Sequence, residues 1–466
     1  TVGNTNLGPS DLAVNASNKL LKKLNFDKSD IDFVVFATST PDYYVPGSGS
    51  IFQEKMGLDN IGVLDIRQGC AGFIYALSVA DKFIKSGVYK NILVIGAEVQ
   101  TTQLDFDNEG RGTAVLFGDG AAACLLSATN KEKGILSTAG TDALAFAARI
   151  ARTYTGRPRL AKFEGGYQGW HDELSVSNAP DLSKAGNKEQ PNTVADSAGA
   201  NIDKNSQTLV LPYNDLATTE KILTKEKNAI ACVIVEPMIH GNNLMPKEGF
   251  LEGLRELCSN LGILLVFDEI VTGFRHGLQG GQGAVNVIPD MGVFGKAMAN
   301  GFIISAVCGK KELLSLVAPE GKVRTAGTFA GSALSCSAAL ATIQVLETPG
   351  FYEHLFKLGN TLRDEVNKTA QQLGVKARCD GYGSVWCMYF SDQIPNDYRD
   401  IANYRANGGI EKDQAYRSHM LNNGIFLRPQ LVNRAYINAA HSENDIQTTL
   451  DVITAFMKEN KQLINN

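Results

Sequence analysis

Two residues that could do chemistry together each follow an apolar run in the middle of the chain. Asp268 follows Leu-Leu-Val-Phe (264–267), and Lys296 follows Met-Gly-Val-Phe-Gly (291–295). Both runs have the composition of short buried strands. In α/β sheets the ligand crevice lies at the carboxyl ends of the strands. We therefore expect the carboxylate and the amine to face one crevice.

A carboxylate and an amine in one crevice suit pyridoxal phosphate. A lysine can form a Schiff base with the aldehyde, and an acid keeps the pyridine nitrogen protonated so that the ring withdraws electrons. Each residue also has a structural alternative, since an acid after a strand often caps a turn and most lysines are solvated. The pair points to such a site only together with further motifs.

Three ordered motifs surround this pair: Phe-Asp-Glu-Ile-Val-Thr-Gly-Phe-Arg (267–275), Phe-Gly-Lys-Ala-Met-Ala-Asn-Gly (294–301) and Ala-Gly-Thr-Phe-Ala-Gly (326–331). They resemble the class III pyridoxal-phosphate-dependent aminotransferases, in the branch that contains glutamate-1-semialdehyde aminomutase. The resemblance implies an α/β fold-type-I transferase with a large α/β domain and a small C-terminal α+β domain. It also implies that Lys296 holds the cofactor and that Asp268 stabilises its pyridinium.

Other residues of the cofactor site follow from the same resemblance. Gly140 and Thr141 precede a helical run, where backbone N–H groups could bind a phosphate or simply begin a helix. Tyr167 matches the aromatic residue that stacks on the ring, Glu236 matches an acid near the cofactor, and Thr328 is expected to bind phosphate across a subunit boundary. Further positional candidates are Gly241 or Asn242 for the cofactor oxygen, and Arg275 or Arg324 for a substrate carboxylate. The implied partners are an amino donor, an acceptor and a second copy of the chain.

A third candidate for chemistry lies near the N-terminus. Cys70, in Gln-Gly-Cys-Ala-Gly-Phe (68–73), is predicted at a turn between an apolar strand at 63–66 and a helix. The positive end of a helix lowers a thiol pKa, and small neighbours let a substrate carbonyl approach the sulfur. The alternative is a buried structural cysteine.

The region around Cys70 resembles 3-oxoacyl-ACP synthase III, an enzyme with the thiolase fold. The similar segments are 37–42, 65–73, 75–80, 95–98 and 116–121. Cys70 matches the acyl-accepting cysteine, so the resemblance implies acyl-CoA or acyl carrier protein as a partner. That family also uses a histidine and an asparagine from the second half of its fold. All six histidines here lie at position 171 or later, so condensation by this chain alone is not expected.

The chain is therefore interpreted as a fusion of two partial enzymes. We predict a partial thiolase-like fold at 1–137, a cofactor-binding large domain at 138–340 and a small C-terminal domain at 341–466. No Pro/Gly/Ser-rich or charged linker separates the two resemblances. Three functions remain open: amino transfer, acyl transfer through Cys70, and an inactive scaffold.

Composition narrows the classes of function. A length of 466 residues indicates two to four domains. The net charge of −5 gives no electrostatic reason to expect nucleic acid or an anionic membrane. The eight cysteines form no Cys-x-x-Cys pair and have no histidine at metal-ligand spacing, so we expect reduced thiols in a cytoplasmic protein and no metal. No apolar run reaches the roughly 18 residues of a membrane span, and no signal peptide is expected.

Spacing also predicts individual elements. Strands are expected at 31–38, 160–163, 231–235 and 385–390. Helices are expected from Ser10 to Leu24, and at 51–56, 248–261, 351–373 and 443–458, with a further helix starting at Ser332. Residues 175–206 are expected to form a surface loop.

Overall fold

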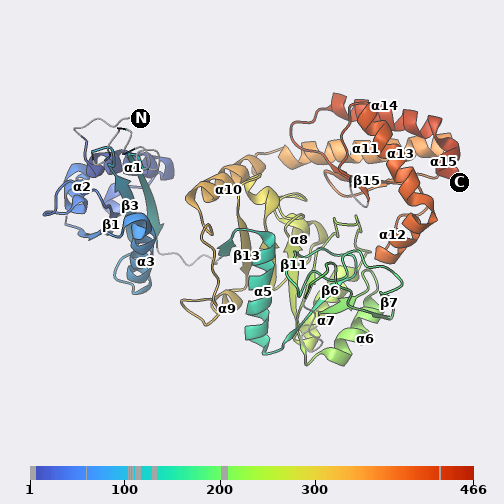
Figure 1. Ribbon diagram of the computed structural model, residues 1–466, viewed down its shortest axis with the longest axis horizontal. Coiled ribbons are helices and arrows are strands. Elements are labelled where there is room, and N and C mark those ends of the chain that lie inside the picture. Colours follow the sequence, from blue (N-terminus) through green and yellow to red (C-terminus); the bar gives the residue numbers. More distant parts are fainter. Residues whose placement is uncertain are drawn as a thin grey trace. The chain divides into compact units, whose positions relative to one another are not determined.

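The computed structural model describes residues 7–58, 60–102, 104, 107, 110, 117–127, 134–200, 208–429 and 432–466 (Figure 1). Leu116 of the synthase-like motif and residues 201–206 of the predicted loop lie outside this set. The chain divides into two compact units, Thr1–Lys131 and Glu132–Asn466.

The first unit contains a four-stranded sheet in the order β2-β1-β3-β4, with β4 antiparallel to β3. Helices α1 and α2 pack on one face of the sheet and α3 packs on the other, because β1 and β3 are apolar on both sides. Helix α1 begins at Pro9 after Gly8, one residue before the predicted start, and the Ser10 hydroxyl donates to Asp42 instead. The elements are α1 (Pro9–Leu24), η1 (Lys28–Asp30), β1 (Phe33–Ala37), α2 (Ser48–Met56), β2 (Gly62–Ile66), η2 (Gly69–Ala71), α3 (Gly72–Lys85), β3 (Asn91–Glu98) and β4 (Gly120–Ser127).

The second unit is built on a seven-stranded sheet in the order β5-β13-β12-β11-β10-β6-β9. The strands from β12 to β9 run parallel, while β13 and β5 are antiparallel to their neighbours. The strands are β5 (Gly134–Ser137), β6 (Arg159–Phe163), β9 (Leu209–Leu211), β10 (Ile230–Val235), β11 (Leu264–Glu269), β12 (Met291–Phe294) and β13 (Ser305–Gly309).

Helices cover both faces of this sheet. Helix α5 (Gly140–Thr155) packs its alanine-rich side against β10, β12 and β13, while α7 (Phe250–Leu261) buries Leu251 and Leu254 on the other face. The remaining helices of this layer are α6 (Leu216–Glu226), α8 (Gly280–Val285), η3 (Lys296–Ala299), α9 (Lys311–Leu314) and α10 (Ala333–Leu346). The mixed α/β architecture agrees with the predicted fold class.

The C-terminal part of the second unit is a small α+β layer with its own core. The antiparallel sheet β14-β15-β16 packs against α11, α13 and α14. Its elements are α11 (Phe351–Leu373), β14 (Arg378–Asp380), β15 (Val385–Tyr389), α12 (Tyr398–Tyr404), η4 (Arg405–Gly409), α13 (Ile410–Asn422), β16 (Asn433–Tyr436), α14 (Glu443–Glu459) and α15 (Lys461–Asn465).

Both predicted domain boundaries are displaced in the structure. Strand β5 was assigned to the synthase-like part, yet it pairs with β13 and so belongs to the second unit. The division at 340/341 falls inside α10, which continues to Leu346. Sequence similarity marks where a family motif ends, whereas hydrogen bonding decides which sheet a strand joins.

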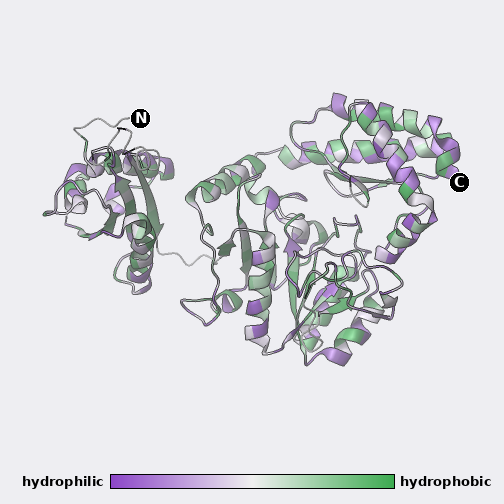
Figure 2. Ribbon diagram, in the orientation of Figure 1, coloured by the Kyte–Doolittle hydropathy of each residue, from purple (hydrophilic) through white to green (hydrophobic). Residues whose placement is uncertain are grey.

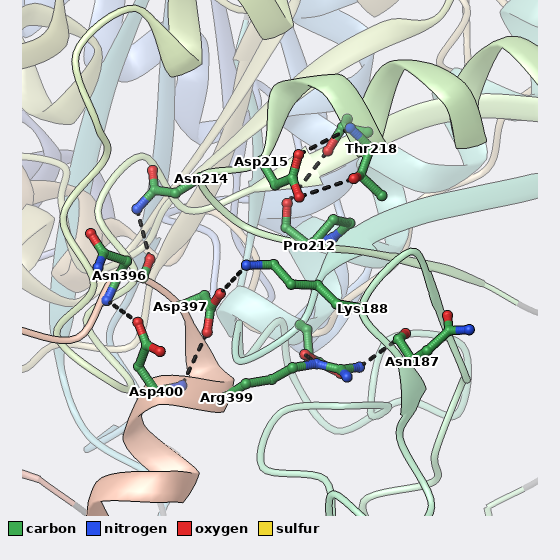
Figure 3. A network of polar contacts seen from close by, with 12 residues as sticks. Asn187, Lys188, Pro212, Asn214, Asp215, Thr218, Asn396, Asp397, Arg399 and Asp400 are labelled. Atoms are coloured by element: carbon green, nitrogen blue, oxygen red, sulfur yellow. Dashed lines mark hydrogen bonds and ion pairs between the residues drawn. The ribbon is translucent and has the colours of Figure 1, made fainter.

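The predicted surface loop at 175–206 is more ordered than its composition suggests. It contains the short hairpin of β7 (Gly186–Asn187) and β8 (Gln190–Pro191). A polar network ties this hairpin to the start of α12 (Figure 3). Arg399 makes an ion pair with buried Glu164 at 2.9 Å and donates to three carbonyls of the 185–187 segment, and Lys188 pairs with Asp397 at 2.7 Å.

Within the described part of the chain, no helix is both long and apolar enough to cross a membrane. The same residues contain no cluster of three or more histidine, cysteine or acidic side chains that could hold a metal ion.

Candidate active site

A cavity of about 760 Å³ lies within the second unit, and Asp268 and Lys296 both line it. Asp268 lies near the carboxyl end of β11, and Lys296 follows the neighbouring parallel strand β12 by two residues. The small C-terminal layer contributes Arg428, Arg434 and Tyr436 to the same cavity. The crevice predicted from strand order is therefore present, and it brings the acid and the amine together.

Asp268 is a buried acid that faces the cavity. Its Oδ1 accepts a hydrogen bond from the Ile270 backbone N–H at 3.1 Å, and only 4% of the residue is exposed. Burial raises the pKa of this carboxyl, and the negative charge of Glu236 raises it further. Among the described residues, no lysine, arginine or histidine lies within ion-pair distance of Asp268. The charge of Lys296 opposes this rise in pKa, and a protonated ring nitrogen in the cavity would add a further cation.

Lys296 occupies the first position of η3, in a conformation that is uncommon for a side chain other than glycine. Its φ is 41°, in the left-handed region. Unlike Asp268, the lysine is exposed. Backbone conformations of this kind concentrate at functional sites, where the surrounding structure holds them.

The N-terminus of α5 lies at the cavity. The N-cap residue Ala139 has no side chain able to cap the helix, and the first backbone bond of the helix is Ala143 N to Ala139 O. The N–H groups of Gly140 and Thr141 precede that bond, and both residues line the cavity. N–H groups without an intrahelical partner at the positive end of a helix are a common place for an anion to bind, and this helix has 16 residues.

A glycine-rich loop after β6 brings Tyr167 to the cavity. Tyr167 is 50% exposed, so its ring is available to a flat ligand, whereas Gln168 beside it is buried. Gly169 has φ +87°, and a Cβ there would lie 2.7 Å from the Thr141 hydroxyl. Glycine at this position therefore lets the tyrosine loop approach the start of α5.

Glu236 lies in the cavity wall next to a pair of histidines that the sequence analysis did not single out. His240 Nδ1 lies 2.8 Å from the Met238 carbonyl and 3.2 Å from Glu236 Oε1, and its Nε2 lies 3.0 Å from His276 Nε2. Burial lowers the pKa of His240 to about 3 and also depresses that of His276. The lowered pKa values favour the neutral form of both rings, so this pair adds no charge beside the cavity.

The remaining predicted residues differ in whether they line the cavity. Gly241 and Asn242 both line the cavity, but the Asn242 amide donates to the Gly165 carbonyl at 2.6 Å. Arg275 lines the cavity, whereas Arg324 and Thr328 are exposed and are not among its lining residues. Cys70 is an exposed free cysteine in η2 of the first unit, directly before α3, where the sequence placed it.

Sequence reasoning missed Arg434 and Tyr436. A signal was available, because residues two apart on a strand share one face, and both lie on β16. The strand has only four residues, so its pattern is weak in the sequence alone.

Comparisons with known proteins agree with this geometry. The family model for class-III aminotransferases matches residues 119–440. A glutamate-1-semialdehyde 2,1-aminomutase from Citrifermentans bemidjiense is 38% identical over 315 residues, which cover 67% of this chain and 71% of that protein. The chain belongs to the class-III aminotransferase family.

Other members of this family are similar in sequence or in structure. Glutamate-1-semialdehyde 2,1-aminomutase 2 of Lachnoclostridium phytofermentans is 37% identical, over 68% of this chain and 73% of its own length. An omega-transaminase from Sphaerobacter thermophilus superposes with a TM-score of 0.64 at 28% identity, over 70% of this chain and 74% of that one. A glutamate-1-semialdehyde aminomutase from Pseudomonas aeruginosa PAO1, solved in complex with PMP, gives 0.61 at 27% identity, over 70% and 72%.

A second family model, for 3-oxoacyl-[acyl-carrier-protein] synthase III, matches residues 64–143. It overlaps the class-III aminotransferase match between residues 119 and 143. The predicted resemblance of the N-terminal part is therefore also found by comparison.

Proposed function

We propose that the second unit binds pyridoxal phosphate and transfers an amino group, as an aminotransferase or an aminomutase. The observation that carries this proposal is the convergence of three features on one cavity: buried Asp268 without a cationic partner, Lys296, and the uncapped start of α5. The amino donor and acceptor are small molecules that enter the same cavity.

When bound, the cofactor supplies an electron sink for the substrate carbon. The residues of the chain then have separate tasks. The Asp268 carboxylate would stabilise the positive ring nitrogen, the Gly140 and Thr141 N–H groups would bind the phosphate, and the Tyr167 ring would stack on the ligand. Lys296 Nζ would hold the aldehyde end of the cofactor, and its amine would serve as the base that accepts a proton from the substrate carbon. Burial raises the pKa of Glu236 to about 7, and the charges of Arg434 and Lys296 oppose this rise.

Borohydride trapping tests this proposal directly. The purified protein is incubated with pyridoxal phosphate, its visible absorbance is recorded, and the complex is reduced and digested for peptide mapping. We expect a visible band and a phosphopyridoxyl group fixed on Lys296. A Lys296→Ala variant should lose both, while Lys322→Ala, which removes an exposed lysine outside the cavity, should keep both. Modification scattered over surface lysines would reject the proposal.

We also propose that the active form is a cytoplasmic homodimer, in which the partner's copy of Thr328 completes the phosphate site. Helix α10 is apolar around most of its circumference, as its colour in Figure 2 shows. Leu334, Leu340 and Val345 on this helix, with Phe329 before it, are more than half exposed. Contiguous exposed apolar side chains typically mark an interface. Light scattering should give twice the mass of the 50.1 kDa chain, and a monomer would contradict this part of the proposal.

Acyl transfer through Cys70 is the second candidate function. Cys70 is exposed and lies in η2, two residues before α3 begins at Gly72, and that helix has no side-chain cap. These features favour a reactive thiol. Incubation with an acyl-CoA, followed by mass spectrometry, should show one acyl group that is absent from Cys70→Ala. If neither this label nor the Lys296 adduct forms, the fusion is an inactive scaffold.

A further inference from the structure

The start of helix α12 packs against the loop that brings Tyr167 to the cavity. This tyrosine loop, residues 165–169, directly follows Glu164. Gly165 has φ +87°, and a Cβ there would lie 2.8 Å from the Cβ of Tyr398, the first residue of α12. Glycine allows this close approach because it has no side chain. The small C-terminal layer therefore packs directly on a loop of the cavity.

Arg399 holds the residue immediately before the tyrosine loop. Its Nε donates to Glu164 Oε2 at 2.9 Å and its Nη2 donates to Oε1 at 3.2 Å. Glu164 is 3% exposed, and two parallel hydrogen bonds to one carboxylate fix its orientation as well as its charge. The same guanidinium donates to the carbonyls of residues 185–187 at the β7–β8 hairpin (Figure 3). Arg399 therefore joins α12, the hairpin and the entry to the tyrosine loop.

The ring of Tyr167 is supported only through the backbone of this loop. The Gly165 N–H donates to the Ser177 carbonyl at 2.9 Å, and the Gly165 carbonyl accepts from the Asn242 amide at 2.6 Å. Tyr167 itself is 50% exposed. Within the described part of the chain it makes no hydrogen bond and no contact with another aromatic ring. The direction of its ring therefore depends on the backbone that leads to it.

We propose that Arg399 is a positioning residue for ring stacking, because through Glu164 it holds the tyrosine loop so that the Tyr167 ring faces the cofactor. This inference rests on the proposed function and adds to it a residue outside the cavity lining. An ion pair that served stability alone would have the same effect on cofactor binding whether or not residue 167 is aromatic. The two roles can therefore be separated.

A double-mutant cycle on pyridoxal phosphate affinity makes this separation. Arg399→Lys keeps a cation beside Glu164 but loses the paired N–H groups. Tyr167→Ala should weaken cofactor binding about twofold to tenfold, the range that corresponds to an aromatic stacking contact. Arg399→Lys should weaken binding within the same range in the parent chain and should have no further effect in the Tyr167→Ala background. Visible absorbance titrations measure each affinity.

Lys188→Ala is the matched control, because it breaks the neighbouring Lys188–Asp397 pair of the same network and leaves the Arg399–Glu164 pair in place. It should not change cofactor affinity in either background. Glu164→Gln is a second variant that leaves Arg399 on its hairpin carbonyls, and its effect should depend on Tyr167 in the same way. Urea denaturation of the cofactor-free chains should show a loss of stability for Arg399→Lys that is equal with and without the Tyr167 ring.

The possible outcomes are distinct. An equal loss of affinity from Arg399→Lys in both backgrounds would overturn the inference and assign Arg399 to stability alone. Unchanged affinity of Arg399→Lys in the parent chain would overturn it as well. A parent chain without a Lys296 adduct after borohydride reduction would instead reject the proposed function, and this inference with it.

Discussion

Replacing Asp268 by Asn should stabilise the cofactor-free protein. In the folded chain, burial and the charge of Glu236 raise the pKa of Asp268 to about 8 from an ordinary value of 3.8. Between these values the folded state holds a proton that the unfolded state releases, so the free energy of unfolding falls as pH rises. Each pH unit in this window corresponds to about 1.4 kcal/mol. The cost at pH 7 is therefore on the order of 4 kcal/mol.

Asn has the same shape, keeps an acceptor for the Ile270 N–H and carries no charge. The stability gain of Asp268→Asn should therefore be small near pH 4 and should grow with pH up to about 8. Urea denaturation of cofactor-free protein at several pH values measures it. Tryptophan fluorescence is the suitable probe, because both tryptophans, Trp170 and Trp386, lie in the second unit.

Asp290→Asn provides the opposite case. Burial alone would raise the pKa of Asp290, but hydrogen bonds from Lys310, the Leu265 N–H and Arg255 lower it. Removing the Asp290 charge in Asp290→Asn should lower the free energy of unfolding by an amount that does not change between pH 5 and pH 8. If the Asp268→Asn gain were also independent of pH, or were a loss, the reasoning about Asp268 would be refuted. The Asp268→Asn variant should also bind pyridoxal phosphate more weakly, since the ring nitrogen loses its carboxylate.

Three other changes should be measurable. Lys162→Met should cost about 1–3 kcal/mol in urea denaturation, because the fully buried ammonium donates to two loop carbonyls that would lose their donor. Arg399→Gln should cost about 3–5 kcal/mol by leaving buried Glu164 without its cation, whereas Lys188→Ala, at a partly exposed pair, should cost less than about 1 kcal/mol. Gly169→Ala should reduce pyridoxal phosphate affinity in absorbance titrations while leaving the melting temperature of the first unit unchanged, because the added methyl displaces the tyrosine loop from the start of α5.

Much of the fold was predictable because its strands and helices have strong periodicity. Asp268 and Lys296 were found because each follows an apolar strand, and parallel strands end at a common edge. The contacts of the small layer were not predictable in this way. Whether Arg434 reaches the cavity depends on how β16 docks beside Arg275, more than 150 residues earlier in the chain, and no local pattern encodes that distance. The His240–His276 contact was also not predictable, because the local sequence around either histidine gives no sign that the two rings meet.

The position of β5 bears on how two partial enzymes could be joined at all. This strand resembles the synthase in sequence, yet it forms one border of the aminotransferase sheet, antiparallel to β13. A strand at the edge of a sheet pairs through backbone hydrogen bonds, which depend little on side-chain identity. Peptides that add a strand to an exposed sheet edge bind in this way. A borrowed segment can therefore serve as the last strand. In doing so it covers the edge of β13, and β5 becomes the strand whose outer edge is open to a further partner.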